Sequence, residues 1–283
     1  MIDSRELDKF ISDALYEDVH EGDHSSLAAI DKNAQGKARL LVKDSGLLCG
    51  IEVAQAVFRK MDSNLKVNIH IEEGSRIKYG DIAFHVYGSA ISILTAERLV
   101  LNCMQRMSGI ATKTNQYVKA IEGTSAKVID TRKTTPNLRF LEKYAVTVGG
   151  GFNHRFGLYD MIMLKDNHID FCGGITKAVQ KVHEYLKVNN LDLRIEVETR
   201  SLENVKEVLL CGGIDRIMLD NFVPEKVKEA VDLINGRYET EASGGITLET
   251  IRSFAETGVD FISVGALTHS VRSLDLSLKA EIG

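Results

Sequence analysis

The chain has 283 residues, of which 44% are apolar and 27% are charged, and its formal net charge is −5. This length fits one large domain or two ordinary ones, and the composition is that of a soluble globular chain rather than a disordered, collagen-like or disulfide-rich one. The acidic balance argues against nonspecific binding of nucleic acid.

The sequence carries no pattern typical of a membrane span, a secretory leader or a zinc ribbon. No run approaches the ~18 apolar residues of a transmembrane helix. The first ten residues, MIDSRELDKF, are charged from position 3 and contain no apolar core of a secretory signal. The four cysteines are far apart and form no CxxC pair, which excludes a zinc ribbon and a thioredoxin motif. We therefore expect a cytoplasmic protein with reduced thiols.

The N-terminal part, residues 1–94, carries strand patterns separated by turns. KARLLVKDSGLLCG predicts two short strands around Asp44, Ser45 and Gly46. LKVNIHIEEG alternates apolar and polar residues, which predicts a strand with one buried face. Residues 51–61 have a helical period instead. Together these patterns predict a mainly antiparallel sheet with helices on it, an α+β unit.

A long helix and a series of βα units are predicted next. The segment from Leu94 to Gly123 contains no proline and predicts a helix that Gly109 interrupts and Gly123 ends. Beyond it, short apolar runs end in polar residues at intervals of 22 to 35 residues, which is the length of a βα unit. These runs are AKVID (126–130), MIMLK (161–165), LRIEVE (193–198), RIMLD (216–220), YETEAS (238–243) and FISVG (261–265).

The segments between these runs have the period of amphipathic helices. We expect Pro224 in the first turn of one helix and Thr247 as the N-cap of another. Six or seven such units form either a barrel or an open, doubly wound sheet. A barrel is favoured because no GxGxxG or Walker motif marks a nucleotide crevice, and because polar residues end successive strands, as in a barrel site.

Basic residues are concentrated between Arg98 and Lys165. This segment contains eleven Lys or Arg and four Asp or Glu, although the whole chain is acidic. A local excess of positive charge suggests a site for a small anion. The alternative is a solvated helix face, which charge alone does not exclude.

Arg132 and Lys133 are the first candidate ligands for that anion. They follow the first strand of the series, and a new helix is expected to start at residues 134–136. A guanidinium group matches the geometry of a carboxylate or phosphate, and the neighbouring ammonium adds a point charge. On its own, this pair is also compatible with an ordinary loop.

Three further basic residues recur near the next strand. His154 and Arg155 follow the glycines at 149–151, which permit close backbone approach. Lys165 ends the strand, where we expect it to be buried and to point into the barrel mouth beside an anion. The alternative is that these are exposed loop residues.

Glycine-rich turns follow the last two strands. Ser243, Gly244 and Gly245 follow the penultimate strand, and Gly265 and Ala266 follow the last. Backbone N–H groups of such turns, together with a helix N-terminus, bind phosphate, and barrels bind phosphate at the loops after their last strands. We expect a phosphate site here, although an isolated SGG is also a common turn.

Two carboxylates, Glu198 and Asp220, end adjacent strands. In a basic site, carboxylates hold sugar hydroxyls, hold Mg²⁺ through phosphate, or stabilise a developing cation. The alternative is that they only pair with Lys165 or another neighbour. Glu196 shares a face with Glu198, so both are expected to line the barrel interior.

Several long motifs, in one order, resemble the quinolinate phosphoribosyltransferase family, also called nicotinate-nucleotide pyrophosphorylase (carboxylating). The resemblance runs from GDHSS at 22–26 to VGALTHSVRSLDLSL at 264–278. Asn137 stands where the family usually has glycine, and His24 and Ser25 depart slightly from its pattern. The specific parts are AERLVLNCMQRMSGIAT (96–112), DTRKTTPNLRFLEKYAV (130–146), GGGFNHRFGLYDMIMLKDNHI (149–169), EVETRSLENV (196–205), MLDNF (218–222) and SGGI (243–246).

The resemblance implies a subunit of two domains. An N-terminal α+β sandwich is expected over residues 1–110, with a C-terminal tail at about 272–283 returning to it. An open α/β barrel of TIM-like type, with six or seven strands, is expected over 111–271. The resemblance also implies a homodimer or larger homo-oligomer, in which the N-terminal region of one subunit covers the barrel mouth of its partner.

The activity implied is transfer of phosphoribosyl from 5-phosphoribosyl 1-pyrophosphate to quinolinate, with Mg²⁺, giving nicotinate mononucleotide, pyrophosphate and CO₂ in NAD biosynthesis. The residues implied for the dicarboxylate are Arg98 (from the partner subunit), Arg132, Lys133, His154, Arg155 and Lys165. Those implied for ribose and phosphate are Glu198, Asp220, Ser243, Gly244 and Gly265, together with the loop neighbours Gly245 and Ala266.

Catalytic roles fall on Lys133, Lys165, Glu198 and Asp220. Mg²⁺ is expected to be held mainly through pyrophosphate, with Glu198 and Asp220 as the candidate protein ligands. Lys133, Lys165 and water all remain candidates for the group that supplies the proton after CO₂ leaves.

Two alternative functions remain at this point. A related phosphoribosyltransferase that acts on another base, such as the relative associated with molybdate transport, shares DTRK-like and SGIAT-like motifs. A catalytically silent anion-binding protein is the alternative from another class, although the intact set of charged residues argues against it.

Overall fold

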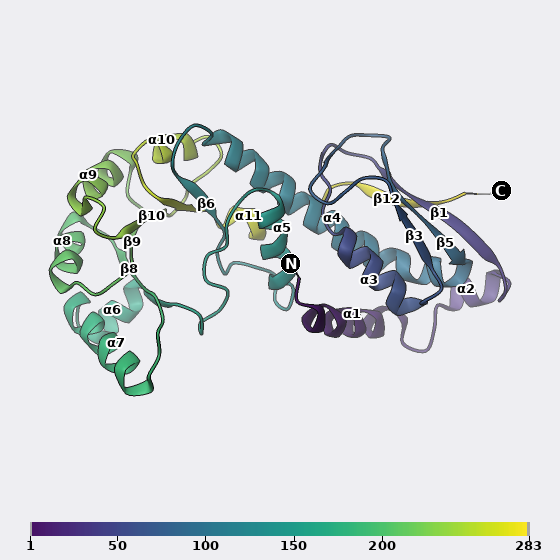
Figure 1. Ribbon diagram of the computed structural model, residues 1–283, viewed down its shortest axis with the longest axis horizontal. Helices are drawn as coiled ribbons and strands as arrows, with labels where there is room; N and C mark the ends of the chain where they lie inside the picture. The colour runs from purple at the N-terminus through teal and green to yellow at the C-terminus, as the bar shows by residue number, and fades with distance from the viewer. Residues whose placement is uncertain (1, 282–283) are drawn as a thin grey trace. The chain divides into compact units, whose positions relative to one another are not determined.

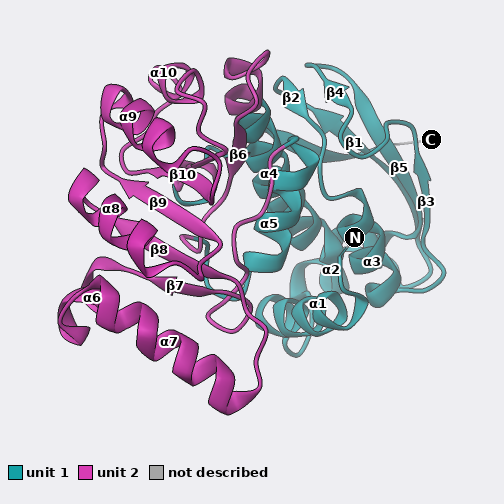
Figure 2. Cartoon of the chain, turned by 60° about the vertical axis from the view of Figure 1, so that its left-hand side comes forward, with its two compact units in different colours: residues 1–115, 134–150, 268–283 teal, residues 116–133, 151–267 magenta. Residues whose placement is uncertain are grey.

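The computed structural model describes residues 2–281, which form two compact units (Figure 2). Within that range, unit 1 comprises residues 2–115, 134–150 and 268–281, and unit 2 comprises residues 116–133 and 151–267. The contiguous ranges expected from the sequence differ from these units mainly because residues 134–150 belong to unit 1. Among the described residues, no helix combines the length and apolar character needed to cross a membrane.

Unit 1 contains an antiparallel sheet of four strands in the order β12-β1-β5-β3 (Figure 1). The last described strand therefore pairs with the first. A separate pair, β2 and β4, extends the unit. The strands of unit 1 are β1 (Gln35–Val42), β2 (Gly46–Leu47), β3 (Lys66–Ile69), β4 (Arg76–Ile77), β5 (Ile82–Ser89) and β12 (Leu276–Ala280).

Helices of unit 1 pack on this sheet. The rings of Phe58 on α3 and Phe84 on β5 meet edge to face, with centroids 6.0 Å apart. The carboxylate of Glu73 accepts the backbone N–H groups of Gly50 and Ile51, which satisfies the free donors at the start of α3. The helices are α1 (Ser4–Val19), α2 (His24–Ala29), α3 (Ile51–Met61), α4 (Ala90–Ala120, mostly in unit 1) and α5 (Arg139–Val148).

Two helix boundaries in this unit differ from the prediction. Helix α4 is continuous through Gly109, where an interruption was predicted. A Cβ at Gly109 would lie 2.4 Å from the carbonyl oxygen of Arg272, so glycine allows a close backbone approach here and does not break the helix. Helix α5 begins at Arg139 and not at 134–136, because a turn containing Asn137, at φ 62°, precedes it. Asparagine tolerates that left-handed conformation, as expected.

Unit 2 is an open α/β barrel of six parallel strands, which confirms the predicted barrel. The strand order is β6-β11-β10-β9-β8-β7. From β7 to β11, each strand pairs with the next one along the chain, and β11 then pairs with β6. The barrel is open between β6 and β7, which are the two ends of the sheet. The strands are β6 (Lys127–Ile129), β7 (Ile162–Leu164), β8 (Ile195–Thr199), β9 (Arg216–Asp220), β10 (Glu239–Ser243) and β11 (Phe261–Ser263).

The helices of unit 2 lie outside the curved sheet, as Figure 1 shows for α7, α8 and α9. Pro224 is the first residue of α9, as predicted. The prediction of Thr247 as an N-cap was wrong, because α10 begins at Ile251 after Thr250, and the carbonyl of Thr247 closes the preceding turn. The helices are α6 (Asp166–Cys172), α7 (Ile175–Asn189), α8 (Leu202–Cys211), α9 (Pro224–Ile234) and α10 (Ile251–Ala255), followed by α11 (Ala266–His269).

Candidate active site

The carboxyl ends of the parallel strands in unit 2 bring most of the predicted site residues to one edge of the barrel. Lys165 follows β7, Glu198 is the fourth residue of β8, and Asp220 and Ser243 end β9 and β10. Because parallel strands point the same way, their carboxyl ends share one edge. Four other predicted residues follow β6 or β11 in sequence: Arg132, Lys133, Gly265 and Ala266.

Three predicted ligands of the base are exposed: Arg98, Lys133 and Lys165. Arg98 lies on α4 in unit 1 and is exposed, and its role in the partner subunit's site stays a prediction. Lys165 is exposed at the start of α6, so the expectation that it is buried was wrong. The strand ends one residue earlier, and the N–H of Lys165 donates to Nδ1 of His168 at 3.0 Å, which directs the chain into the helix.

A backbone bridge brings His154 to the same edge. Phe152 pairs with Ile129 beside β6. The buried carboxylate of Asp130 then accepts the backbone N–H of His154 at 2.9 Å. The position of His154 is therefore fixed by the end of β6, although 24 residues separate it from Asp130.

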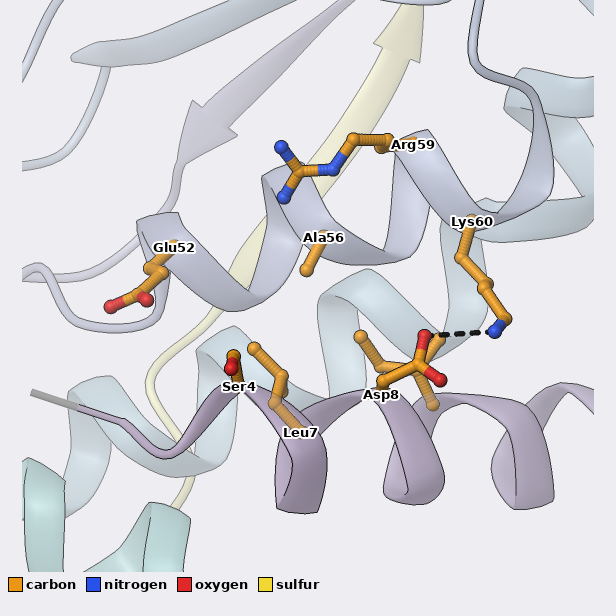
Figure 3. Close-up of a pocket in the computed structure, with 8 residues that line it drawn as sticks. Ser4, Leu7, Asp8, Glu52, Ala56, Arg59 and Lys60 are labelled. Carbon is orange, nitrogen blue, oxygen red and sulfur yellow. Dashed lines mark hydrogen bonds and ion pairs between the residues drawn. The ribbon is translucent and has the colours of Figure 1, made fainter.

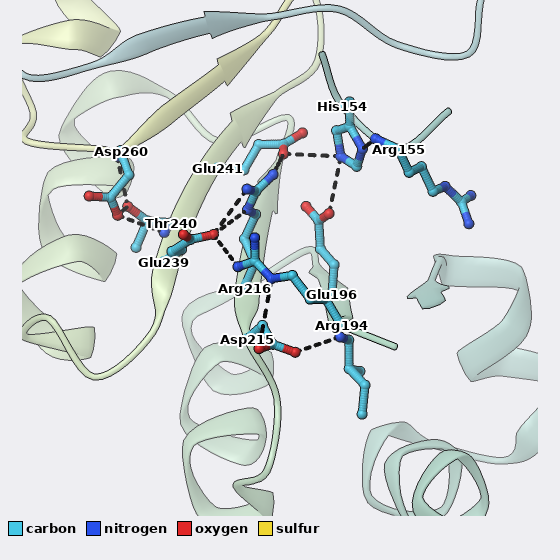
Figure 4. Close-up of polar contacts among 11 residues, drawn as sticks. His154, Arg155, Arg194, Glu196, Asp215, Arg216, Glu239, Thr240, Glu241 and Asp260 are labelled. Atoms are coloured by element: carbon cyan, nitrogen blue, oxygen red, sulfur yellow. Dashed lines mark hydrogen bonds and ion pairs between the residues drawn. The ribbon is translucent and has the colours of Figure 1, made fainter. Parts of the chain in front are cut away.

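Beneath this edge lies a buried polar cluster, shown in Figure 4. The Nε2 atom of His154 lies 3.1 Å from a carboxylate oxygen of Glu196 on β8 and 3.2 Å from one of Glu241 on β10. Arg216 on β9 donates to the same oxygen of Glu241 at 3.0 Å, and Glu239 is its other partner. The side chains of Glu196 and Glu241 are fully buried, so this cluster fills part of the barrel interior.

The protonation of the cluster follows from its geometry. The backbone N–H of Arg155 donates to Nδ1 of His154 at 2.6 Å, which favours the imidazole form with its proton on Nε2. Burial lowers the pKa of His154, but Glu196 and Glu241 outweigh it and raise the pKa. A cationic ring would also carry a proton on Nδ1, where the N–H of Arg155 points, so this hydrogen bond favours the neutral ring. Burial, with repulsion from Glu241, raises the pKa of Glu196 to about 7. Burial acts on Glu241 in the same direction, but His154 and Arg216 outweigh it and lower its pKa.

Two arginines repel each other at the rim of the site. Arg155 is half-buried, and its guanidinium donates to the carbonyl of Met161 at 3.2 Å. Burial lowers the pKa of Arg155, and repulsion from Arg132 lowers it further. Both effects disfavour the charged guanidinium, so a bound anion would be stabilising here. This is the electrostatic character expected of a site for a multiply charged anion.

The carboxylates Glu198 and Asp220 form an acidic side of the same edge. The N–H of Asp166, at the start of α6, donates to Glu198 at 3.3 Å. Burial raises the pKa of Glu198, and repulsion from Asp220 acts in the same direction. A cation beside these carboxylates would relieve that repulsion, so the residues fit a divalent ion such as Mg²⁺.

The turn after β10 combines one enclosed glycine with one open glycine. A Cβ at Gly244 would lie 2.2 Å from the side-chain oxygen of Asn221, so Gly244 is required by its protein neighbour. A Cβ at Gly245 would meet no atom within 4 Å, and its φ is 61°. Gly245 is thus the position where a ligand can approach the backbone. The helices that follow, α10 and α11, have five and four residues, so they contribute less to an anion site than the sequence suggested.

A groove in unit 1, between α1 and α3, has a volume of 280 Å³ (Figure 3). Asp8 and Lys60 form an ion pair at 2.8 Å across it. None of the predicted site residues lines this groove, so it has no part in the site at the barrel edge.

Two family models match the chain, and together they cover most of it. The model of the quinolinate phosphoribosyl transferase C-terminal domain matches residues 110–279, and that of the N-terminal domain matches residues 23–108. The chain belongs to the quinolinate phosphoribosyltransferase family. The resemblance found in the sequence is therefore confirmed.

Several members of the quinolinate phosphoribosyltransferase family are similar to this chain over nearly its whole length. A chloroplastic nicotinate-nucleotide pyrophosphorylase (carboxylating) of Arabidopsis thaliana is 47% identical over 98% of this chain and 83% of its own. A probable enzyme of the same name from Bacillus subtilis is 41% identical, over 96% of this chain and 93% of its own. The crystal structure of NadC from Streptococcus pyogenes has a TM-score of 0.93 at 43% identity and covers 99% of this chain and 97% of its own.

Three residues that shape the candidate site were not predicted from the sequence. Glu241 and Arg216 belong to the short strands β10 and β9, and the sequence analysis gave neither of them a role in the site. The signal was available, because Glu239 and Glu241 are two residues apart on β10 and must share a face. Asn221 was also missed: its φ of 58° and its contact with Gly244 set the turn after β10.

Proposed function

We propose that this chain transfers phosphoribosyl from 5-phosphoribosyl 1-pyrophosphate to quinolinate, with decarboxylation, giving nicotinate mononucleotide, pyrophosphate and CO₂. Family membership supports this reaction. The observation that carries it is the half-buried Arg155, which His154 and Asp130 place at the end of β6 and whose pKa is lowered by burial and by repulsion from Arg132. Two adjacent carboxylates of one substrate would pair with both guanidinium groups and offset that repulsion.

The substrate determines which residues form the base pocket. Quinolinate carries two neighbouring carboxylates, which are stable in a partly dry pocket only when several cations surround them. Arg132, Arg155, Lys133 and Lys165 supply those cations in this proposal. His154 supplies no free Nε2, since that atom faces Glu196 and Glu241. In this proposal, His154 therefore contributes to the pocket by positioning the next residue, Arg155, and by the orientation of its own ring.

In the first step, the ring nitrogen of quinolinate attacks the anomeric carbon of the ribose, and the bond to pyrophosphate breaks. The transition state resembles an oxocarbenium ion, which carboxylates stabilise. Glu198 and Asp220 hold the ribose hydroxyls in this proposal, and Ser243, Gly244, Gly245, Gly265 and Ala266 hold the 5′-phosphate. Glu198 and Asp220 would hold Mg²⁺ together with the pyrophosphate, and the ion would supply positive charge for the leaving group.

In the second step, the carboxylate next to the ring nitrogen leaves as CO₂. The alkylated nitrogen is cationic, so it accepts the electron pair that the broken carbon–carbon bond leaves behind. A proton then bonds to that carbon, and Lys133, Lys165 and water are the candidate donors. The protein contributes fixed charge and orientation, while the substrate itself provides the electron sink.

The assembly and the location of the protein also belong to the proposal. We expect a homodimer or a larger homo-oligomer in which Arg98 reaches the partner subunit's base pocket. The exposure of Arg98 is compatible with such a role. A cytoplasmic location is part of this proposal, whereas the Arabidopsis relative is named as chloroplastic.

A calorimetric titration tests the identity of the base. We expect quinolinate to bind and nicotinate, with one carboxylate fewer, to bind at least about 30-fold more weakly, because one charge-assisted contact pair is lost. Equal affinity for the two would indicate a phosphoribosyltransferase for another base. Binding of neither, in the absence and presence of 5-phosphoribosyl 1-pyrophosphate, would contradict the proposal.

A further inference from the structure

The cluster inside the barrel uses charges that the proposed reaction does not need. Glu196 and Glu241 touch no predicted substrate ligand except His154, and both are fully buried. Buried carboxylates cost free energy even when paired, and apolar side chains commonly fill a barrel interior. Their negative charge below the site also opposes the binding of a dianion. Some function must offset these two costs.

The contacts of His154 show what the carboxylates do. On one side of the ring, Nε2 lies between Glu196 and Glu241, at 3.1 and 3.2 Å. On the other side, Nδ1 accepts the N–H of the next residue, Arg155, at 2.6 Å. The backbone N–H of His154 is held by Asp130. The imidazole and the peptide that leads into Arg155 therefore form one rigid connection.

Arg216 completes this arrangement from below. It is buried, it donates to Glu241 at 3.0 Å, and it also donates to the more exposed Glu239. One arginine thus anchors Glu241, Glu241 contacts the imidazole, and the imidazole contacts the N–H of Arg155. A chain of contacts runs from the barrel interior to the backbone N–H of Arg155 (Figure 4).

We infer that Glu196 and Glu241 are positioning residues for the base pocket: they orient the His154 imidazole and, through it, Arg155, so that the guanidinium meets a carboxylate of the base. This inference rests on the proposed function, because it assigns quinolinate affinity to residues that do not touch quinolinate. Partners behind a ligand-binding side chain restrict its orientation, and losing them often reduces affinity about 10- to 100-fold in metal sites.

The same three side chains are close enough to hold a metal ion. The hydrogen bond to Nδ1 argues against that use. A metal bound to Nε2 would leave the ring proton on Nδ1, where the N–H of Arg155 points at 2.6 Å. The geometry therefore favours a proton on Nε2, the ring nitrogen that lies beside the two carboxylates.

Two substitutions of similar shape at one position test the inference. Glu196→Gln removes the charge but keeps a carbonyl oxygen in place of the carboxylate oxygen that lies 3.1 Å from Nε2 of His154. Glu196→Met has a similar length and offers no such acceptor. We expect the Kd of quinolinate to rise about tenfold or more in Glu196→Met and to stay within about threefold of wild type in Glu196→Gln. The Kd of 5-phosphoribosyl 1-pyrophosphate should change less than about twofold in both.

Each other outcome contradicts the inference in a distinct way. If the carboxylate acted only through its charge, both variants would bind the dianion equally, and more tightly than wild type. If Glu196 only stabilised the barrel, Glu196→Met would lose both substrates together and melt at a lower temperature. If the proposed function itself is wrong, the wild-type protein fails to bind quinolinate, which is measured first.

Glu239→Gln is the matched control, because it removes the charge of a carboxylate in the same cluster, where Glu239 pairs with Arg216 and not with His154. Its quinolinate affinity should equal that of wild type. If Glu196→Met does not fold, ¹⁵N-histidine NMR of the wild-type protein tests the contact directly. We expect a proton on Nε2 of His154 that exchanges slowly with solvent. An unprotonated Nε2, as in a metal complex or the other tautomer, would overturn the inference.

Discussion

Replacing Arg155 with alanine tests the proposed dicarboxylate site most severely. The substitution removes a half-buried guanidinium and leaves one carboxylate of quinolinate without its partner. Such a loss costs about 2–5 kcal/mol in buried charge pairs. Removing Arg155 also ends its repulsion with Arg132, and solvent reaches part of the group, so the lower part of the range applies. We expect about 2–3 kcal/mol, which is roughly a 30- to 150-fold increase in Kd.

Calorimetric titration with quinolinate measures this change, and two variants serve as controls. Arg155→Lys keeps the charge but loses the planar fork, so its affinity should fall between those of wild type and Arg155→Ala. Arg200→Ala removes a positive charge just after β8, where Arg200 pairs with the exposed Asp170 at 2.7 Å. Its Kd should change less than about threefold. A loss of threefold or less in Arg155→Ala, or an equal loss in Arg200→Ala, would refute the reasoning.

Three further predictions concern the assembly, the phosphate and the carboxylates. Mixing inactive Arg98→Ala with inactive Lys165→Ala should restore activity, because each mixed dimer contains one site in which neither residue is substituted. If activity does not return although subunit exchange is verified, all residues of the site come from one chain. Gly245→Asn should weaken binding of 5-phosphoribosyl 1-pyrophosphate about tenfold and leave quinolinate binding within about twofold, because asparagine tolerates a positive φ and its Cβ would meet no protein atom within 4 Å. Unchanged binding of 5-phosphoribosyl 1-pyrophosphate would exclude this turn as the phosphate site. Glu198→Gln and Asp220→Asn should lower turnover and alter its Mg²⁺ dependence. Neither should weaken quinolinate binding, because each removes negative charge near a dianion. A tenfold loss of quinolinate affinity in both variants, when both fold, would show that the division of the site into basic and acidic sides is wrong.

The periodicity of the sequence was sufficient to predict the barrel. Strand ends recur at the spacing of βα units, and each lies at the same edge of one parallel sheet, so Glu198, Asp220 and Ser243 were assigned to that edge correctly. The pattern in unit 1 was less informative. Helix α1 was missed, although Asp3 caps it and its apolar residues recur at helical spacing: Leu7, Phe10, Ile11, Ala14 and Leu15.

Other features depend on contacts between residues far apart in the sequence. Gly109 was interpreted as a helix breaker because the approach of Arg272 is invisible in the local pattern. The burial of Glu241 depends on Arg216 and His154, which lie on other segments, so the spacing of Glu239 and Glu241 shows a shared face but not these partners. Lys165 was expected to be buried because it ends an apolar run, yet the strand stops one residue earlier.

The most direct test of the proposed activity follows the carboxylate carbon. The purified protein is incubated with quinolinate labelled in the carboxylate next to the ring nitrogen, with 5-phosphoribosyl 1-pyrophosphate and Mg²⁺. The account predicts one labelled CO₂ released for each nicotinate mononucleotide and each pyrophosphate formed, with no release when 5-phosphoribosyl 1-pyrophosphate is omitted. Nucleotide formation that retains the label, or faster nucleotide formation from nicotinate than from quinolinate, would contradict it.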